Sequence, residues 1–293
     1  MTILDAVIQG IVQGLTEFLP VSSDGHLTLV QYFTGTNGQG SLLFTVMLHL
    51  GTLISVFVFY RHLIGELIIE FFRMCGQIFT GKFHYKACNS QQKMIIMILV
   101  SLIPLLAFYF VKDYFAALAE DNDIIVEGIC FLFTGSLLML ADKCPKDDKV
   151  ASEMKVKDSL IIGFFQGVAA LPGVSRSGST ISVALLRGFS REYAVAFSFI
   201  MGIPAIIGAN VFEVKDAIPA ETQMEFLPIL IGIVLAAAVG FFAIKLIAWL
   251  VKTDKFAVFA YYTLVLGALV ICEGIFEIFA GKNIFQYVGG LIK

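Results

Sequence analysis

Charge is scarce in this sequence, and neither sign dominates. Only 15% of the 293 residues are charged, and the formal net charge at pH 7 is -3. A protein that binds nucleic acid would show a basic face or a cluster of Lys and Arg. The composition therefore indicates no nucleic-acid partner, and it is also poorer in charge than an ordinary soluble domain.

Cysteine motifs and a leader segment are missing as well. The five cysteines occur singly, with neither CxxC spacing nor an accompanying histidine cluster. This pattern indicates neither a zinc site nor a disulfide framework. The first residues lack a basic stretch ahead of the apolar run, so we expect no cleavable signal peptide.

Apolar residues are abundant instead. They make up 58% of the chain, and the mean hydropathy is +0.87, which is typical of a protein that crosses a membrane several times. Segments of about 20 apolar residues, the length that spans a bilayer, fall into two groups of three. The first group lies at 41–60, 93–112 and 123–141, and the second at 192–212, 227–251 and 257–279.

One sequence pattern occurs twice, about half the chain apart. IVQGLTEFLPVSSDGHLTL occupies residues 11–29, and FFQGVAALPGVSRSGSTIS occupies residues 164–182, with one residue inserted between their Gln-Gly and Pro positions. Glu17 has no acidic counterpart in the second copy. The other exchanged positions pair Ser23 with Arg176, Asp24 with Ser177 and His26 with Ser179. An internal repeat interrupted by Gly and Pro in an apolar chain indicates a binding site between two membrane repeats.

The repeated segments are too short to cross a membrane by themselves. Helices within 5–19 and 158–171 have about 14 residues and a length of about 21 Å, whereas the bilayer core is about 30 Å thick. A Pro/Gly/Ser break and a second short apolar helix follow each of them, over 23–33 and 177–187. Irregular backbone at membrane depth is tolerated only where protein encloses it. We therefore predict two re-entrant hairpins, over about 5–33 and 158–187, whose breaks mark a site.

A hairpin returns to the side from which it enters, whereas three spans change side, so the two halves should have opposite orientations. The predicted fold is an all-α polytopic membrane protein with an inverted-topology repeat, in which 1–150 and 151–293 form one integral membrane domain. Basic residues concentrate in the loops 61–93 and 142–158, and acidic residues in 112–123 and 213–225. Because cytoplasmic loops collect Lys and Arg, we expect both termini and the opening of the site on the outer face.

Arg176 occupies the break of the second hairpin, and a charged residue inside a bilayer is usually functional. The second helix of each hairpin begins at the break and directs its free N–H groups and positive dipole end toward the centre. A planar guanidinium suits phosphate oxygens. The hydroxyl groups nearby belong to Ser22, Ser23, Ser175, Ser177, Ser179 and Thr180. This combination predicts a site for the phosphate or diphosphate of a lipid.

These residues also have plain structural interpretations. Ser22 and Ser175 stand at helix-cap positions, where we expect both capping and phosphate contact. Ser179 and Thr180 are as well explained by hydrogen bonds to the backbone or across helices. The glycines of the two breaks, which we expect mainly to permit tight turns and close packing, are Gly25, Gly173 and Gly178.

Glu17 lies near the end of an apolar half-helix, where a carboxylate should be neutral or paired. Gln13 is four residues earlier and therefore on the same helix face. His26 follows the break by one turn and is expected to be functional. The remaining histidines have no comparable neighbours in the sequence, and the last two fall in the predicted cytoplasmic loop: His49, His62 and His84.

The two motifs resemble those of a known family. QGLTEFLPVSSDGH, residues 13–26, is similar to the acidic segment and PVSS(S/T)GH turn of the undecaprenyl-diphosphate phosphatases, also called the bacitracin-resistance proteins. PGVSRSGST, residues 172–180, is similar to their PGxSRSxxT motif. The resemblance implies a hydrolase of the bacterial plasma membrane that removes one phosphate from undecaprenyl diphosphate. It further implies that the enzyme recycles the lipid carrier for cell-wall synthesis and confers resistance to bacitracin.

The resemblance also carries functional positions onto this chain. It implies catalytic roles for Glu17, Ser23, His26 and Arg176, and substrate-binding roles for Gln13, Ser22, Gly25, Ser175, Ser177, Gly178 and Thr180. It implies a divalent cation, with Mg²⁺ preferred and Ca²⁺ as the other candidate. Asp24 stands where the family commonly has Ser or Thr, so its carboxylate either repels phosphate or helps Glu17 to hold the cation.

We hypothesise that Ser23 attacks the terminal phosphorus, with Glu17 or His26 as its base, while Arg176, the helix amino termini and Mg²⁺ neutralise the charge. Attack by His26 itself or by a metal-bound water is left open. The alternative function is a polyprenyl-phosphate transporter or flippase that uses the same midplane anion site, because inverted repeats with broken helices are typical of transporters. A membrane scaffold without chemistry is the third alternative. A homodimer is left open.

Overall fold

The computed structural model describes residues 2–34, 41–110, 124–145, 148–171, 173–217, 226–252, 255–284 and 287. Within these ranges the chain forms eleven α-helices and two 3₁₀ helices, without a β-strand. The α-helices are α1 (Ile3–Thr16), α2 (Ser23–Thr34), α3 (Ser41–Phe59), α4 (Arg61–Phe79), α5 (Ser90–Tyr109), α7 (Ile125–Asp142), α8 (Val156–Val168), α9 (Arg176–Leu186), α10 (Arg191–Ala217), α11 (Phe226–Lys252) and α12 (Ala257–Ala280). The short 3₁₀ helices are η1 (Tyr85–Ala87) and η2 (Ala151–Glu153).

Each of the six predicted spans corresponds to one helix. Five of these helices, α5, α7, α10, α11 and α12, are long and apolar enough to cross a membrane by themselves. The sixth, α3, meets that criterion together with α4, from which it is separated by a bend of 85°. The prediction of an all-α polytopic membrane protein is therefore confirmed.

Helix α4 is a correction to the prediction, which placed a loop over 61–93. The structure forms a helix of 19 residues there, and its buried positions follow the helical period: Ile64, Leu67, Glu70 and Met74. This stripe packs against α5, where the side chain of Gln92 donates to Glu70 over 3.1 Å. The charged residues of α4 suggested a loop, although its apolar residues follow the helical period. The helix is stabilised by packing this apolar stripe against α5.

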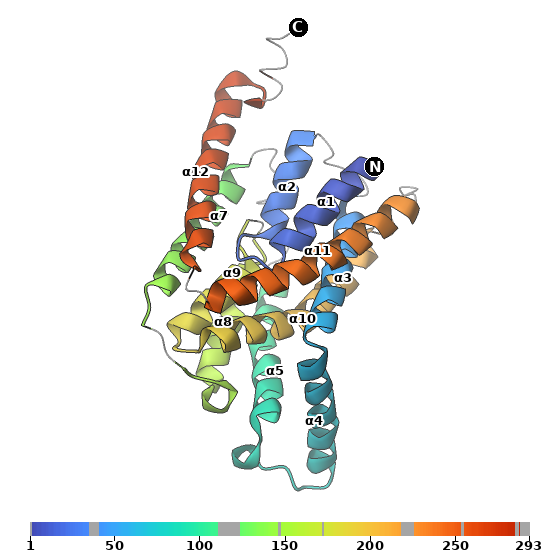
Figure 1. Cartoon of the computed structure of the whole chain (residues 1–293), viewed down its shortest axis with the longest axis vertical. Coiled ribbons are helices and arrows are strands. Elements are labelled where there is room, and N and C mark those ends of the chain that lie inside the picture. Colours follow the sequence, from blue (N-terminus) through green and yellow to red (C-terminus); the bar gives the residue numbers. More distant parts are fainter. Residues whose placement is uncertain are drawn as a thin grey trace.

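The two helix–break–helix units are present as predicted. Helix α1 has 14 residues and begins with a capping box between Thr2 and Asp5, and it leads through the turn at 17–22 into α2. Helix α8 has 13 residues and leads through an irregular stretch into α9. Figure 1 shows the two pairs converging on the middle of the molecule.

Each hairpin packs on a helix of the opposite half. Helix α1 lies against α11, and α8 lies against α5, while α7 pairs with α12 and α3 with α10 (Figure 1). The equivalent helices of the two halves thus exchange partners, which is consistent with repeats related by an approximate two-fold axis. Small residues permit the close approach: an added Cβ on Gly10 would lie 2.9 Å from the carbonyl oxygen of Gly232.

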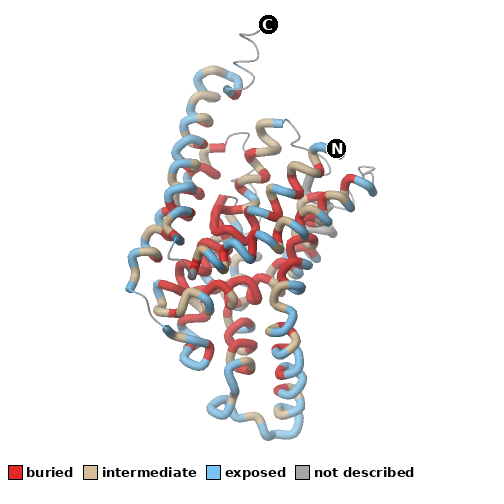
Figure 2. Tube along the Cα trace, viewed as in Figure 1, coloured by how far each residue is buried: buried red, intermediate tan, exposed pale blue. Residues whose placement is uncertain are grey.

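Burial is concentrated where the hairpins meet. Figure 2 shows the buried segments gathered in the middle of the molecule and the exposed ones along its outer helices and ends. Large apolar side chains lie on the exposed outer surface, among them Phe72 of α4, Phe242 of α11 and Leu269 of α12. An apolar exterior around a core that contains buried Ser, Thr, Gln and Glu side chains is the arrangement that a lipid environment favours.

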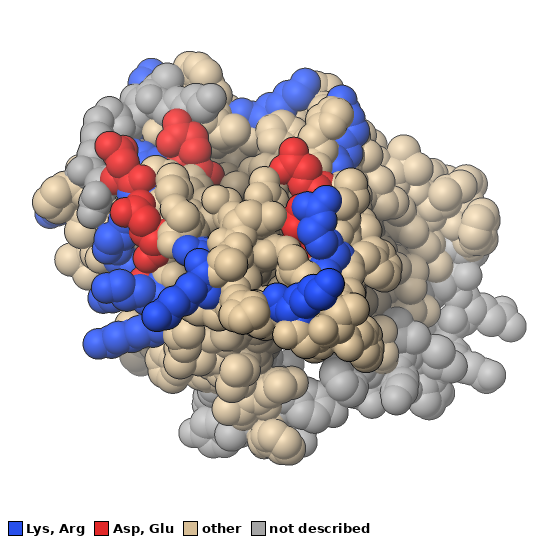
Figure 3. Space-filling model, turned by 90° about the horizontal axis from the view of Figure 1, so that it is seen from below, with Lys and Arg blue, Asp and Glu red and all other residues tan. Residues whose placement is uncertain are grey.

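The two basic connections lie at the same end of the molecule. Lys93 at the start of α5 donates to the carbonyl oxygen of Ser152 in η2 over 3.0 Å. Figure 3, which looks onto this end, shows Lys and Arg side chains around the face with acidic ones between them. The predicted acidic segment 112–123 and most of 213–225 lie outside the described residues. The inner and outer assignments of these loops stay predictions.

Candidate active site

The tips of the two hairpins are in direct contact. The Ser177 hydroxyl of α9 donates to the carbonyl oxygen of Leu19 in the first break over 3.2 Å. An added Cβ on Gly25 would lie 2.9 Å from Cα of Gly173, whose own φ is +93°. These glycines therefore serve the turn and the close approach expected of them, and they bring the first helical turns of α2 and α9 together.

An ion pair joins the two hairpins at this contact. One guanidinium nitrogen of Arg176 lies 2.5 Å from an oxygen of Glu17, and the Glu17 side chain is only 4% exposed. Its other terminal nitrogen, Nη1, is buried without a hydrogen-bond partner among the described residues. Gly202 of α10 makes room for that nitrogen, because an added Cβ there would collide with it. Arg176 is held in place with one group of N–H donors unused.

The second oxygen of Glu17 accepts two further hydrogen bonds. Gln13, one turn earlier in α1, donates over 3.0 Å, and the Ser23 hydroxyl donates over 2.8 Å. The last contact is the geometry required of a hydroxyl nucleophile and its base. The sequence left both Glu17 and His26 as candidates for that base, and the structure places Glu17 at hydrogen-bond distance from Ser23.

His26 faces a different direction. Its Nδ1 lies 2.6 Å from the carbonyl oxygen of Ser22, and its Nε2 lies 2.7 Å from the hydroxyl of Tyr262 in α12. Because a carbonyl oxygen only accepts, Nδ1 carries the proton in the neutral ring, and Nε2 accepts from Tyr262. The ring also stacks on that of Tyr262 at 5.7 Å and touches Phe131 edge-on. Both ring nitrogens are therefore engaged away from Ser23.

His49 is the residue that sequence reasoning missed. It has no neighbours in the sequence comparable to those of His26, but in the structure its Nε2 lies 3.6 Å from Glu17 and 3.5 Å from Asp24. Its Nδ1 is bonded to the carbonyl oxygen of Thr45, one turn earlier in α3. A sequence signal did exist, because an ionisable side chain within an apolar span is a candidate functional residue by position alone. Helix α3 belongs to neither motif, so its packing against the first hairpin, and with it the neighbours of His49, could not be foreseen from the sequence.

Two of the predicted substrate-binding hydroxyl groups are hydrogen-bonded within the protein. Ser175 caps α9 by accepting from the N–H of Gly178 over 3.0 Å, and its own N–H donates to Thr134 of α7. Thr180 is bonded to the carbonyl oxygen of Arg176 and, over 2.6 Å, to the hydroxyl of Ser198. Both Ser175 and Thr180 are therefore committed to the protein scaffold in this arrangement.

Ser22 in the first break has an unusual backbone. Its φ is +71°, and it is the single residue other than glycine with a positive φ in the part of the chain that the structure describes. Its hydroxyl accepts from the N–H of Gly25 over 3.3 Å, so it fulfils the predicted capping role. A left-handed conformation at a side-chain-bearing residue costs about 1 to 3 kcal/mol and is found most often at functional sites.

Comparisons with known proteins show the family of this chain. A family model described as Bacitracin resistance protein BacA matches residues 6–269. The chain belongs to this family. It is 43% identical over 274 residues to the Undecaprenyl-diphosphatase of Alkaliphilus metalliredigens, which covers 92% of this chain and 98% of the relative. The proteins of the same name from Halothermothrix orenii and Methanobrevibacter smithii are 38% and 37% identical and cover 94% and 95% of this chain.

The BacA resemblance predicted from the two motifs is thereby confirmed, and those motifs are the two hairpin tips. The Arg176 of one motif and the Glu17 of the other are ion-paired, so neither motif forms the site by itself.

The residues at the tips offer few ligands to a divalent cation. No group of three or more His, Cys, Asp and Glu side chains that could hold a metal ion occurs within the described ranges. Glu17 is already occupied by Gln13, Ser23 and Arg176, whereas the Asp24 side chain is 53% exposed. Mg²⁺ is commonly held by one or two carboxylates together with substrate phosphates. A cation shared between Asp24 and a bound diphosphate therefore fits these residues, but a cage made by the protein alone does not.

Proposed function

We propose that this protein hydrolyses undecaprenyl diphosphate to undecaprenyl phosphate and inorganic phosphate. The observation that carries the proposal is the Ser23–Glu17–Arg176 arrangement, which combines a hydroxyl, a carboxylate that accepts its hydrogen bond and an anion-binding guanidinium across two hairpins. The name Undecaprenyl-diphosphatase, which the relatives described above share, supports the same reaction.

Arg176 and the amino terminus of α9 are the groups that bind the diphosphate. A phosphate competes with Glu17 for the paired nitrogen of Arg176, and the buried Nη1, which has no partner among the described residues, gains a phosphate oxygen as acceptor once the guanidinium turns toward the ligand. When the substrate takes the paired nitrogen, Glu17 is released from its ion pair with Arg176 and keeps the hydrogen bond from Ser23. Binding of the diphosphate thus prepares the base.

Ser23 is the nucleophile of the proposed reaction. Its oxygen forms a bond with the terminal phosphorus while the bond from that phosphorus to the bridging oxygen breaks, and undecaprenyl phosphate leaves. The hydroxyl proton passes to Glu17 over the existing 2.8 Å contact. Water then cleaves the phosphoserine, which releases inorganic phosphate and restores the hydroxyl. A divalent cation bound by Asp24 and the diphosphate would supply additional charge neutralisation.

The cell context of this reaction follows from its substrate. The lipid carrier is regenerated in the plasma membrane of a bacterium, and removal of the diphosphate form withdraws the target of bacitracin. We further propose that the site opens to the outer face, on the charge pattern of the loops. Cysteines placed at positions 122 and 221 test this orientation: both should react with an impermeant thiol reagent from outside intact cells, and labelling from the cytoplasmic side alone would contradict it.

The decisive experiment is phosphate release from undecaprenyl diphosphate by the protein purified in detergent, in Mg²⁺ and in EDTA. We expect release in Mg²⁺, strong reduction in EDTA, and loss of about a thousandfold or more for Arg176→Ala, as for other arginines that contact a transferred phosphoryl group. Arg187→Ala is the matched control, because Arg187 is paired with Asp158 and takes no part in the contact between the hairpin tips. Binding of the lipid without release under any metal condition would contradict the proposal.

A further inference from the structure

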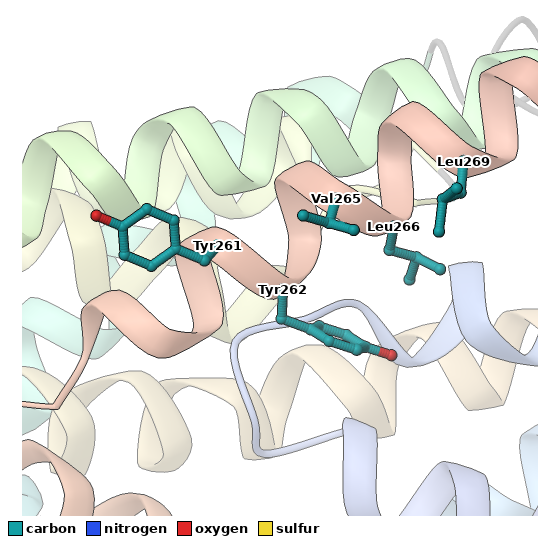
Figure 4. Close-up of a pocket in the computed structure, with 5 residues that line it drawn as sticks. All are labelled: Tyr261, Tyr262, Val265, Leu266 and Leu269. Atoms are coloured by element: carbon teal, nitrogen blue, oxygen red, sulfur yellow. The ribbon is translucent and has the colours of Figure 1, made fainter.

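A shallow apolar cavity lies on α12 beside the active site. Its volume is about 340 Å³, and it is lined by Tyr261, Tyr262, Val265, Leu266 and Leu269. These positions recur at intervals of three and four residues, so they share one face of the helix. Figure 4 shows Tyr262 extending from α12 toward the ribbon of the first hairpin, with Leu266 and Leu269 on the same side of the helix.

The neighbouring face of α12 is occupied by α7. Close packing at glycines holds the two helices together: an added Cβ on Gly267 would lie 2.7 Å from the carbonyl oxygen of Gly128, and one on Gly135 would lie 2.7 Å from Thr263. The cavity residues are on the remaining surface, where Val265 is 60% and Leu269 is 62% exposed. This face is therefore open to the surroundings.

Tyr262 joins the cavity to the active site. Its ring lines the cavity, while its hydroxyl is bonded to His26, which itself lies one turn from Ser22. A tyrosine hydroxyl in an apolar environment needs a hydrogen-bond partner, and here that partner belongs to the first hairpin. One residue thus lines the apolar cavity and contacts the first hairpin tip.

The inner wall of the cavity is part of a buried hydrophobic cluster. Leu266 packs against a buried cluster of Leu29, Ile124, Phe131 and Val270, which joins α2, α7 and α12. Phe131 also touches His26. The position of the cavity relative to the hairpin tip is therefore fixed by the core.

We propose that this cavity binds the first prenyl units of the substrate, those next to the diphosphate. This inference rests on the proposed function, because it takes the lipid diphosphate as the ligand of the tips. Its volume is at the lower end of the range for small-molecule pockets, so it holds only the beginning of a long polyprenyl chain, and the rest extends into the bilayer. Tyr262 marks the boundary between the headgroup and the chain.

Filling the cavity tests the proposal. Val265→Trp places a large ring in it, and Val234→Trp on α11 is the matched control, because Val234 is 56% exposed and belongs to a different helix. For undecaprenyl diphosphate we expect Val265→Trp to raise KM about tenfold, the effect of losing contacts with a few methylene groups, with kcat within about twofold. Inorganic diphosphate, which has no chain, should show KM changes below about twofold if it is hydrolysed.

A second measurement is independent of hydrolysis. A polyprenyl diphosphate with a diazirine in its first prenyl unit should crosslink, on illumination, to the peptide that contains residues 261–269, and unlabelled lipid should compete. Crosslinks located only elsewhere would overturn the proposal, as would equal KM values for Val265→Trp and Val234→Trp, which would mean that bulk lipid or a second copy of the chain covers this face. Failure of the wild type to hydrolyse any lipid, with crosslinking at 261–269 retained, would overturn the phosphatase and leave the cavity assignment standing.

Discussion

The two hairpin tips share a backbone plan but differ in how firmly their polar groups are held. In the second tip, Ser177, Ser179 and Thr180 are almost fully buried, and Ser175 caps α9 with an ordinary φ of -74°. In the first tip, Ser22 has a φ of +71°, while Ser23, Asp24 and His26 are all partly accessible.

This difference is consistent with the proposed division between binding and chemistry. An anion site works best when its donors are fixed before the ligand arrives, and the second tip provides Arg176 on a rigid, buried helix. A nucleophile and its base must reach the substrate and exchange protons, and the pair that we propose, Ser23 and Glu17, belongs to the first tip with its strained and more accessible turn. The two copies of the sequence repeat thus form similar frames, to which we assign different parts of the proposed reaction.

The largest expected effect comes from removing a serine hydroxyl from the first tip, compared with removing one from the second. Ser23→Ala should lower kcat for undecaprenyl diphosphate by about a thousandfold or more, because the proposed nucleophile is removed. Ser179→Ala, which removes a hydroxyl from the second tip, should leave kcat within about twofold, since the Ser179 hydroxyl is buried without a partner in the described structure. Steady-state phosphate release measures both. Near-normal turnover by Ser23→Ala would eliminate the serine nucleophile and favour attack by water.

The next effect concerns the space around Arg176. Gly202→Ala adds a methyl group where Nη1 of Arg176 lies, so the guanidinium must move. A displacement of this size should lower kcat/KM by about a hundredfold. Gly208→Ala on the same helix is the control, because an added Cβ at Gly208 meets no atom within 4 Å. Equal activities of the two variants would show that Arg176 is not rigidly placed.

A smaller effect is expected at His49. His49→Gln retains a polar side chain but removes the imidazole that lies 3.6 Å from Glu17 and 3.5 Å from Asp24 and helps to hold both carboxylates in place. Loss of one such polar interaction, worth about 1 kcal/mol, corresponds to a decrease of about fivefold in kcat/KM. His62→Gln, at the exposed start of α4, should have no effect. If the two variants are indistinguishable, His49 is a bystander.

The smallest effect is on stability and not on chemistry. Ser175→Ala removes the cap of α9 and should lower the free energy of unfolding by about 1 kcal/mol, seen as a lower Tm in one detergent. Ser182→Ala removes a buried hydroxyl that has no partner among the described residues, and its Tm should be unchanged or higher. A Tm that falls equally in both variants would mean that burial volume, and not capping, determines the loss.

Much of the fold could be predicted because membrane helices are recognisable from their composition. The bilayer requires a minimum length and an apolar composition of each span. The bounds of the five helices that span by themselves are therefore close to those expected from hydropathy: α5, α7, α10, α11 and α12. The hairpin breaks were equally visible in the two copies of the repeat. Helix α4 was not foreseen, because its stability depends on one buried stripe against α5 and not on the apolar length that a span requires.

The candidate site was predictable only in part. Glu17 and Arg176 were recognisable singly, as charged residues at breaks in apolar helices. The orientation of His26 depends on Tyr262 of α12. The position of His49 between two carboxylates depends on the packing of α3. Neither helix contains one of the two motifs. Contacts between residues that are distant in sequence follow from helix packing, and a single sequence does not encode them in readable form.

The sequence by itself determined the environment, the duplication and the family of this protein, because hydropathy and motif spacing are local properties of the chain. Only the tertiary structure decided that Glu17, and not His26, receives the Ser23 hydrogen bond, which residues surround it, and that Tyr262 of α12 contacts the first hairpin. The physical reason is the exchange of partners between the two halves. Each hairpin is placed by helices of the other half, so the site exists only after both have folded around each other.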